Sequence, residues 1–407
     1  MKLLISAFSC QPNSGSEPGI GWGVVREAAR RHSVWVLTDS HNRPGIEREL
    51  GENGLPGAHF VYVALPPGFQ KLAAVRWRGY VYYLLWQIRA YRVARRLHRR
   101  RRFDLVHHVS YGNSWAPSFM GFLGLPFIWC AGARETTPWR FLRALSWRGR
   151  ASEAVRNLAA AVLGTVTLRL TATRASIILT PSDAGLWGGL RTTAQFPLGG
   201  LNLSDAARLR SLPERRERPF RVVSIGRLVA WKGFGLGLMA FAAVHKDLPE
   251  SEYWIVGDGP ERPALEKLAR RLGCASQVQF RRWLPRDRVP ETLAQVDVLV
   301  HPSLHEQFGY VVLEAMAAGR PVVCLRAGGC GRLVSGGGGI AIPVSTPERV
   351  VRELHQVLLE MARDPEKRFD MGRLARARAL GQWSWERVGE RLARLYESAS
   401  PLRKQLS

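Results

Sequence analysis

Residues 296–323 read VDVLVHPSLHEQFGYVVLEAMAAGRPVV, and this stretch decides the fold. A β-branched apolar run opens it, as in a buried strand, and a polar loop carrying Glu306 follows. The next apolar run, with Glu314 inside it, predicts a helix that ends near Gly319, and Pro321 begins another strand. Strand, loop, helix and strand in this order form a βαβ unit, which is typical of a parallel sheet.

The same alternation runs along the whole chain of 407 residues. Strand-like runs lie at 2–8, 33–38, 59–65, 103–109, 126–130 and 175–182 in the first half, and at 221–228, 253–259, 278–284, 296–303 and 320–325 in the second. Helical segments separate these runs. The pattern predicts an α/β protein with two consecutive doubly wound, Rossmann-like domains that face each other across a ligand cleft.

A polar, proline-containing stretch at 208–220 interrupts the alternation. Its charged residues Arg215, Arg216, Glu217 and Arg218 are expected to stay exposed, as in a linker or a domain edge. The predicted domains are 1–200, 201–385 and a C-terminal helix over 386–407 that packs back toward the first domain.

The composition excludes several classes of protein. The five cysteines form no CxxC pair, so neither a disulfide framework nor a zinc site is indicated and a reducing compartment is expected. The N-terminal apolar run is too short for a signal peptide, and no apolar window is long enough to span a bilayer. The net charge of +26 fits a codon bias toward arginine, an anionic ligand, nucleic acid or an anionic membrane surface.

A glycine-rich turn with two cations follows the strand-like run at 221–225. Gly226, Arg227 and Lys232 stand between this strand and the next helix, where glycine lets the backbone approach a phosphate and the helix supplies N–H donors. The GxxxxGK[ST] pattern of a Walker A loop is absent. We interpret the turn as an anion site, with solvated surface cations as the alternative.

Two further features lie at the same edge of the predicted sheet. The turn at 257–259 (Gly-Asp-Gly) suits either a ligand contact or a tight turn with a helix cap. Glu314 lies in an otherwise apolar helix, which is costly unless the carboxylate is paired or bound to hydroxyl groups. We favour a polyol ligand for Glu306 and Glu314, with a capping acid and an incidental helical glutamate as the alternative.

Together these segments resemble a GT-B glycosyltransferase of family GT4. The resemblance rests on GRLVAWKG at 226–233, the Gly-Asp-Gly turn and the E-x7-E spacing of Glu306 and Glu314. The segments GSEPGIGWG (15–23), FDLVHHVSYGNSWAPSFM (103–120) and WSWERVGERLARLYE (383–397) extend it over nearly the whole chain. It implies an acceptor-binding first domain and a second domain that binds a nucleotide-diphosphate sugar.

The resemblance also implies roles for individual residues. Arg227 and Lys232 would bind and stabilise the donor diphosphate, Glu306 would contact the transferred sugar, and Glu314 would bind the ribose. The remaining implied residues are the catalytic His107 and the substrate-binding Gly15, Ser16, Gly226, Gly257, Trp283, Leu284, Phe308, Gly309 and Tyr310. Such enzymes retain the anomeric configuration and need neither a metal nor a cofactor, and the chain has no Asp-x-Asp metal motif.

The sequence departs from the family pattern in its first half. The family often has His-x-His where this chain has the adjacent pair His107 and His108. Adjacent side chains of a strand point to opposite faces, so one histidine at most is expected to be catalytic, and a packed sheet histidine is the alternative. FPLGG around Pro197 and GARETTP around Glu135 also differ from the family, which affects the acceptor side.

A basic, aromatic stretch spans 71–103. Its aromatic residues and arginines suit either an amphipathic helix on an anionic leaflet or a helix packed on the sheet with its arginines in water. The expected partners are thus a nucleotide-sugar donor, a glycan or lipid-linked acceptor and an anionic membrane surface, with no specific nucleic acid. The expected location is cytoplasmic, peripheral on the inner face of the cell membrane. A GT-B-type sugar-nucleotide epimerase and a basic nucleic-acid-binding protein are the alternatives.

Overall fold

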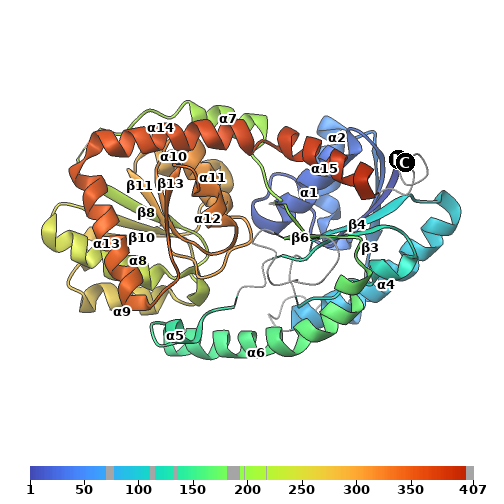
Figure 1. The fold of residues 1–407 in the computed structure, drawn as a ribbon, viewed down its shortest axis with the longest axis horizontal. Helices are drawn as coiled ribbons and strands as arrows, with labels where there is room; N and C mark the ends of the chain where they lie inside the picture. The colour runs from blue at the N-terminus through green and yellow to red at the C-terminus, as the bar shows by residue number, and fades with distance from the viewer. Residues whose placement is uncertain are drawn as a thin grey trace. The chain divides into compact units, whose positions relative to one another are not determined.

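The computed structural model describes residues 1–69, 78–110, 115–132, 136–180, 193–196, 198–216 and 218–399. The chain forms two compact units (Figure 1). The first comprises residues 1–134, 159–199 and 385–407, and the second comprises 135–158 and 200–384. The prediction placed the boundary between the two domains at residue 200. In the structure, residues 135–158 belong to the second unit, and the C-terminal helix belongs to the first. No described helix is long and apolar enough to cross a membrane.

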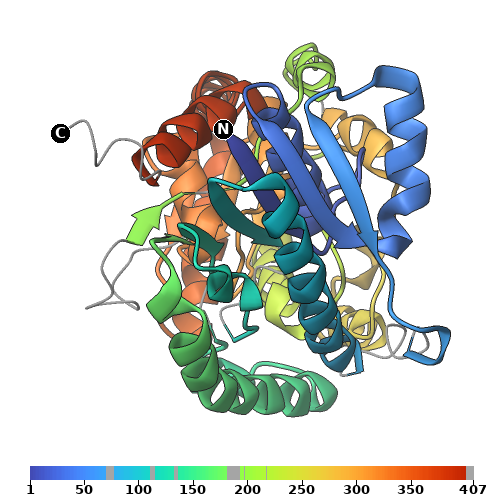
Figure 2. The same cartoon turned by 90° about the vertical axis from the view of Figure 1, so that its right-hand side faces the viewer.

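The first unit is built on a parallel sheet in the order β3-β2-β1-β4-β5-β6-β7 (Figure 2). The strands are β1 Lys2–Ala7, β2 Ser33–Asp39, β3 Ala58–Val63, β4 Leu105–Ser110, β5 Phe127–Cys130, β6 Ile177–Thr180 and β7 Thr193–Gln195. The helices are α1 Ser16–Ala29, α2 Arg43–Asn53, α4 Arg78–Arg101 and α15 Trp385–Ala399. Helix α6 (Trp147–Leu170) gives its residues from Ala159 onward to this unit.

The second unit has a parallel sheet in the order β10-β9-β8-β11-β12-β13. Its strands are β8 Arg221–Ile225, β9 Glu252–Val256, β10 Val278–Arg281, β11 Val298–His301, β12 Val322–Leu325 and β13 Gly339–Ile342. Its helices are α5 Trp139–Leu142, α7 Leu203–Arg210, α8 Phe234–Asp247, α9 Arg262–Arg271, α10 Val289–Ala294, α11 Tyr310–Ala317, α12 Gly328–Val334, α13 Pro347–Arg363 and α14 Pro365–Gln382.

Strand pleating divides the core of the second unit into two layers. Val222 and Val300 face the layer that α8, α9 and α13 cover. Val223 and Leu299 face the opposite layer, which is filled from α10, α11, α12 and α14. Because both faces are covered by helices, the strands are apolar on both sides, and the predicted doubly wound architecture is confirmed.

Helix α4 carries most of the basic, aromatic stretch, and its aromatic face is buried. Tyr82, Trp86, Ala90 and Ala94 follow one another at four-residue spacing and pack on the sheet of the first unit. The Trp86 Nε1 donates to the carbonyl of Val63 at 3.1 Å. The packed-helix alternative therefore holds for the described part of 71–103, whose arginines Arg92, Arg95, Arg96 and Arg99 are exposed.

The segment before β8 contradicts one expectation. Arg215 was expected to be exposed, but its side chain is buried and its Nη1 donates to Asp297 Oδ2 at 2.5 Å. The same carboxylate accepts from the backbone N–H of Arg221 at 2.8 Å and lies 3.4 Å from Arg368 Nη2. Two buried guanidinium groups thus share one buried carboxylate, which ties the linker to the second unit. Of the four residues named for the linker, Arg216 and Arg218 are exposed, and Glu217 lies outside the described residues.

This network predicts a large stability effect at one position. Replacing Asp297 by asparagine keeps the shape but leaves Arg215 and Arg368 without their counter-charge, which we expect to lower the free energy of unfolding by about 3 kcal/mol. Urea unfolding measures this loss. The control Asp287→Asn removes an exposed carboxylate of the same unit and is expected to change stability by less than about 0.5 kcal/mol. Equal stability of both variants would contradict the network.

Candidate functional site

The order of strands in the second unit reverses between β8 and β11, so a crevice-forming switch point lies beyond their carboxyl ends. The turn at 226–233 follows β8 and the loop at 302–309 follows β11. Gly257 follows β9, and Trp283 follows β10. Because all these strands are parallel, the second-half residues that the sequence singled out lie at one edge of one sheet.

Glycine is required where the first two turns meet. Gly257 has a φ of +141°, and a Cβ built on it would lie 2.0 Å from the carbonyl oxygen of Gly226. The Gly226 N–H donates to the carbonyl of Val256 at 2.9 Å. The two backbones therefore run in contact. The side chain of Arg227, the next residue, is exposed and forms no ion pair with the residues that the structure describes.

Lys232 and Glu306 meet across the switch point. The Lys232 Nζ donates to Glu306 Oε2, and His301 Nε2 lies 3.1 Å from the same oxygen. Burial raises the pKa of the Glu306 carboxyl, but Lys232 and the hydrogen bond from His301 outweigh burial and hold that pKa well below its usual range. Glu306 is therefore an anion whose charge is balanced by a lysine from the neighbouring loop.

The Glu306 carboxylate is also part of the one group of ligating side chains among the described residues that could hold a metal. His301, Glu306 and Cys330 offer ligand atoms within 4.8 Å of one another. However, the ammonium group of Lys232 already forms an ion pair with the Glu306 carboxylate. A cation bound there would have to displace the lysine, so the residues present suit a lysine-neutralised carboxylate better than a metal centre.

Glu314 has a protein partner that the sequence did not suggest. Arg286 Nε donates to Glu314 Oε1 at 3.0 Å, and Arg286 Nη2 lies 3.0 Å from Asp205 Oδ2. Burial raises the pKa of the Glu314 carboxyl, although Arg286 opposes that rise. The cost of a carboxylate in an apolar helix is thus offset in part by Arg286, so this cost alone does not require a polyol.

Helix α11 begins directly after the Glu306 loop. Its N-cap, Gly309, has a φ of +86°, and a Cβ there would meet the sulfur of Cys330 at 2.5 Å. Phe308 is buried, and its ring packs 5.1 Å from that of Tyr310. In the first turn, the N–H groups of Val312 and Leu313 donate to the carbonyl of Gly309 at 3.0 and 3.2 Å.

Trp283 and Leu284 lie beyond β10. The Trp283 ring is exposed, and its backbone N–H donates to Asp258 Oδ2 at 2.9 Å. Leu284 packs on the core layer that contains Phe308. An exposed aromatic ring beside a fixed backbone is suited to stacking on a flat ligand.

Helix α6 and the loop before Glu306 form a second group that sequence reasoning missed. His305 stacks on Trp231 with 5.3 Å between ring centroids, and Arg156 hydrogen-bonds His305. Glu153, buried on α6, lies 3.6 Å from His305 Nε2. No local pattern indicates these contacts, because Arg156 and His305 are separated by 149 positions. His301 could have been found, since it ends β11 at the ligand edge.

In the first unit, Gly15 caps α1 and Ser16 opens it with a φ of +56°. Ser110, at the end of β4, donates to the carbonyl of Ser9 at 2.8 Å and accepts from the Ser9 N–H at 3.0 Å. The loops after β1 and β4 are thus joined at the switch point of this sheet, where the order also reverses. Residues 111–114, which follow β4, lie outside the described residues, as do Glu135 and Pro197.

His107 has the surroundings of a packed core histidine. It is fully buried inside β4, with Nδ1 2.8 Å from the Tyr396 hydroxyl and Nε2 3.1 Å from the Cys130 sulfur. His108 is also buried, beside Ser6. Burial lowers the pKa of each imidazole to about 3. This placement matches the alternative of a packed sheet histidine, and through Tyr396 His107 is joined to α15.

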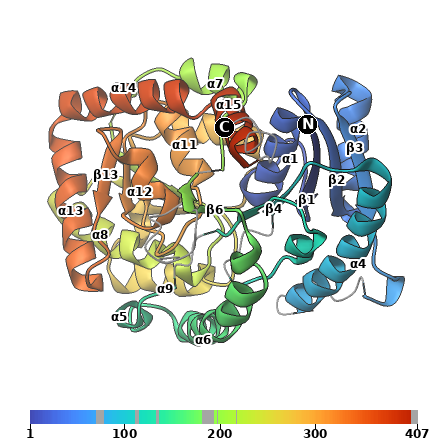
Figure 3. The same ribbon diagram turned by 45° about the vertical axis from the view of Figure 1, so that its right-hand side comes forward.

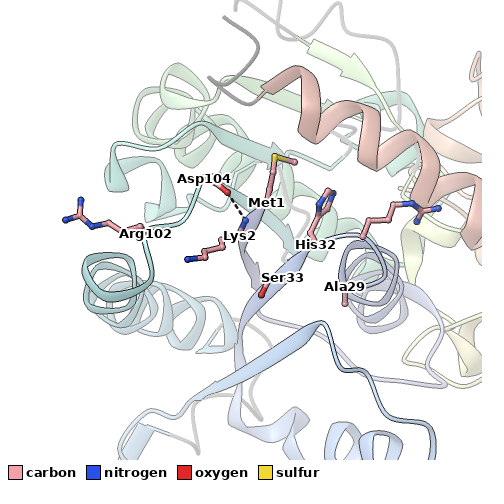
Figure 4. A pocket seen from close by; sticks show the side chains of 8 residues that line it. Met1, Lys2, Ala29, His32, Ser33, Arg102 and Asp104 are labelled. Carbon is pink, nitrogen blue, oxygen red and sulfur yellow. Dashed lines mark hydrogen bonds between the residues drawn. The ribbon is translucent and has the colours of Figure 1, made fainter. Parts of the chain in front are cut away.

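A small hollow of about 650 Å³ in the first unit is not a candidate site (Figure 4). It is lined by residues at the starts of β1 and β2 and by Asp104, which accepts from the Lys2 N–H at 2.7 Å. Ligands of such sheets bind at the carboxyl ends of the strands, and this hollow lies at the amino ends.

Comparisons with known proteins agree with this geometry. A family model described as glycosyl transferases group 1 matches residues 207–378. The lipopolysaccharide core biosynthesis glycosyltransferase LpsE of Rhizobium meliloti (strain 1021) is 32% identical over 269 residues, which cover 62% of this chain and 75% of LpsE. The chain therefore belongs to the group 1 glycosyltransferases.

Two further proteins are similar over different extents. A GDP-mannose-dependent alpha-(1-6)-phosphatidylinositol monomannoside mannosyltransferase of Mycolicibacterium smegmatis is 33% identical over 197 residues, which cover 46% of this chain but only 50% of that enzyme. The crystal structure of Anabaena HepE in complex with UDP and glucose superposes with a TM-score of 0.61 at 21% identity, covering 98% of this chain and 100% of HepE. The fold is therefore that of the GT-B glycosyltransferases.

The buried histidine pair predicts an acid sensitivity. The unfolded chain protonates these histidines near pH 6.5, whereas the folded protein does so near pH 3, so stability is full above pH 6.5 and falls as the pH drops toward 3. Each histidine is expected to contribute about 1.4 kcal/mol per pH unit in that window. Urea midpoints measured from pH 7 to pH 4 are expected to fall less steeply for His107→Gln than for the parent chain. Parallel slopes would contradict this account.

Proposed function

We propose that this protein transfers a sugar from a nucleotide-diphosphate sugar to a glycan or lipid-linked acceptor, with retention of anomeric configuration and without a bound metal. The observation that carries the proposal is the Lys232–Glu306 pair at the switch point of the second unit. It places a cation and an anion side by side at the edge where such sheets bind ligands.

The charges of this site suit the two ends of a sugar donor. A diphosphate develops negative charge as it leaves the sugar, and exposed Arg227 together with Lys232 would stabilise that charge. The donor diphosphate would share Lys232 with Glu306, which leaves the carboxylate facing the hydroxyl groups of the sugar. The bond from the anomeric carbon to the diphosphate breaks, the acceptor oxygen bonds to that carbon, and the acceptor proton leaves with the diphosphate.

The nucleoside end has its own candidates. Glu314 would accept hydrogen bonds from the ribose, beside Arg286, which donates to the same carboxylate. Trp283 would stack beside the base. Gly226 and Gly257 would let the backbone approach the phosphates. The names of the relatives support a sugar nucleotide as donor, since one uses GDP-mannose and HepE was solved with UDP and glucose.

The other proposed details have direct tests. Retention is checked by assigning the anomeric configuration of the product by NMR, and an inverted product would refute it. Metal independence is checked by activity in EDTA, and activity that EDTA abolishes and Mg²⁺ or Mn²⁺ restores would refute that detail.

The donor site predicts a graded response to nucleotide sugars. A thermal-shift panel of UDP-, GDP- and ADP-sugars is expected to contain a donor that stabilises the parent chain and is consumed only when acceptor is present. Because Arg227 would bind the diphosphate, Arg227→Ala is expected to need about tenfold more donor for the same thermal stabilisation.

Arg363→Ala is the matched control, since it removes an exposed arginine at the end of α13, away from the ligand edge. An equal response of both variants would remove Arg227 from the site. Donor consumption without acceptor would point to an epimerase, and retention on DNA without any nucleotide effect would point to a nucleic-acid-binding protein.

A further inference from the structure

Arg286 lies between two carboxylates and an aromatic ring of the second unit. Its Nε donates to Glu314 Oε1 at 3.0 Å, and its Nη2 lies 3.0 Å from Asp205 Oδ2. Its guanidinium carbon lies 5.4 Å from the centre of the Tyr310 ring, and Tyr310 precedes Glu314 by four positions on α11. Residues four positions apart share one face of a helix, so Arg286 covers the face of α11 that carries the Glu314 carboxylate.

The planar fork of the arginine side chain explains how one residue holds both carboxylates. One nitrogen of a guanidinium group can meet one carboxylate while another nitrogen meets a second, whereas a lysine presents a single charged nitrogen. Only 23% of the Arg286 side chain and 9% of the Glu314 side chain are exposed. Ion pairs with so little solvent around them are screened less than exposed pairs. Arg286 therefore fixes the direction in which the Glu314 carboxylate points.

Helix α7 supplies the second anchor of Arg286. It packs beside α11 in the second unit (Figure 3). The Asp205 N–H donates to Oδ1 of Asn202, the N-cap of α7, at 2.8 Å, which fixes the first turn of this helix. One turn further along, Arg208 Nη2 donates to the carbonyl of Asp287 at 2.9 Å. The turn at 286–288 is thus tied to α7, and Arg286 keeps its place without depending on Glu314 alone.

This arrangement leaves one oxygen of Glu314 for a ligand. Oε1 accepts from Arg286, and Oε2 forms no hydrogen bond with the residues that the structure describes. Two carboxylates share one guanidinium group here, so acidic groups outnumber basic ones. Such a group suits a hydroxyl group, which can donate a hydrogen bond, and disfavours a phosphate at the same position.

We propose that Arg286 is a positioning residue for the ribose of the donor nucleotide. By holding Oε1 of Glu314 it directs Oε2 toward one ribose hydroxyl group, so the site distinguishes a ribonucleotide from its deoxy counterpart. A carboxylate that is already fixed needs no ordering when the nucleotide binds, which favours the hydrogen bond. The inference rests on the proposed function, since it takes Glu314 as the ribose ligand.

Calorimetric affinities for matched nucleotides test this role. The probes are UDP, GDP and ADP, each with its 2′-deoxy and 3′-deoxy counterparts. Each pair shares the base and the diphosphate, so the ratio of the two dissociation constants isolates the contact with one hydroxyl group. For the nucleotide that binds the parent chain, loss of one of the two hydroxyl groups is expected to weaken binding at least about tenfold. In Arg286→Met, this ratio is expected to fall below about threefold, because the carboxylate is no longer fixed.

The matched control is Arg288→Met. It removes an arginine from the same turn whose side chain is 59% exposed and pairs with Glu291, so the ratio of the parent chain is expected to persist. In the background of Glu314→Gln, adding Arg286→Met is expected to leave the ratio unchanged, because Arg286 acts only through that carboxylate. Asp205→Asn removes the second anchor and is expected to lower the ratio, and it carries the test if Arg286→Met does not fold.

The ratio separates positioning from a general loss of structure. A distorted site would weaken both nucleotides of a pair alike, and equal ratios in Arg286→Met and in the parent chain would overturn the proposal. So would a parent chain that does not distinguish the deoxy nucleotides, or a ratio that falls further when Arg286→Met is added to Glu314→Gln. A parent chain that binds none of the three nucleotides would overturn the proposed function, and this inference with it.

Discussion

The reversal of strand order between β8 and β11 is the constraint on which the candidate site depends. Because of this reversal, the connections that follow the two strands lead to opposite sides of the sheet, and the turn at 226–233 lies opposite the loop at 302–309. Lys232 and Glu306 come from these two segments, and their ion pair neutralises an anion that burial alone would disfavour. A donor diphosphate would enter a place where the protein has already positioned positive charge, so little reorganisation is needed when charge develops.

The first unit repeats this topology with different chemistry. Its switch point joins the loops after β1 and β4 through Ser9 and Ser110, and its two histidines are used for packing within the sheet. The lysine–carboxylate pair proposed to receive the diphosphate lies in the second unit. Family membership agrees with this division, since the matched region of the family model lies at 207–378.

Much of the fold could be predicted from the sequence, because a parallel sheet covered on both faces makes each inner strand a continuous apolar run. The exceptions follow the same rule. β7 (Thr193–Gln195) is a short edge strand with a polar composition, and β13 begins in a glycine run, so neither has that signal. The strand-end positions of Gly226, Lys232 and Glu306 could also be predicted, since they depend only on where a strand stops.

Features that depend on distant partners could not be predicted. Arg215 can be buried because it forms an ion pair with Asp297, which lies 82 positions away in the sequence. Glu314 is paired by Arg286 from another loop. The sequence shows that these charged and polar side chains are present, but it does not show which of them are in contact. The role of each side chain depends on its partner in the folded chain.

Calorimetric binding of the nucleoside diphosphate and of the corresponding nucleoside, to the parent chain and to Lys232→Met, tests the central claim most directly. If Lys232 holds the diphosphate at the switch point, the variant binds the diphosphate at least about tenfold more weakly and binds the nucleoside as the parent does. An unchanged affinity for the diphosphate would contradict the placement of the donor site at the Lys232–Glu306 pair.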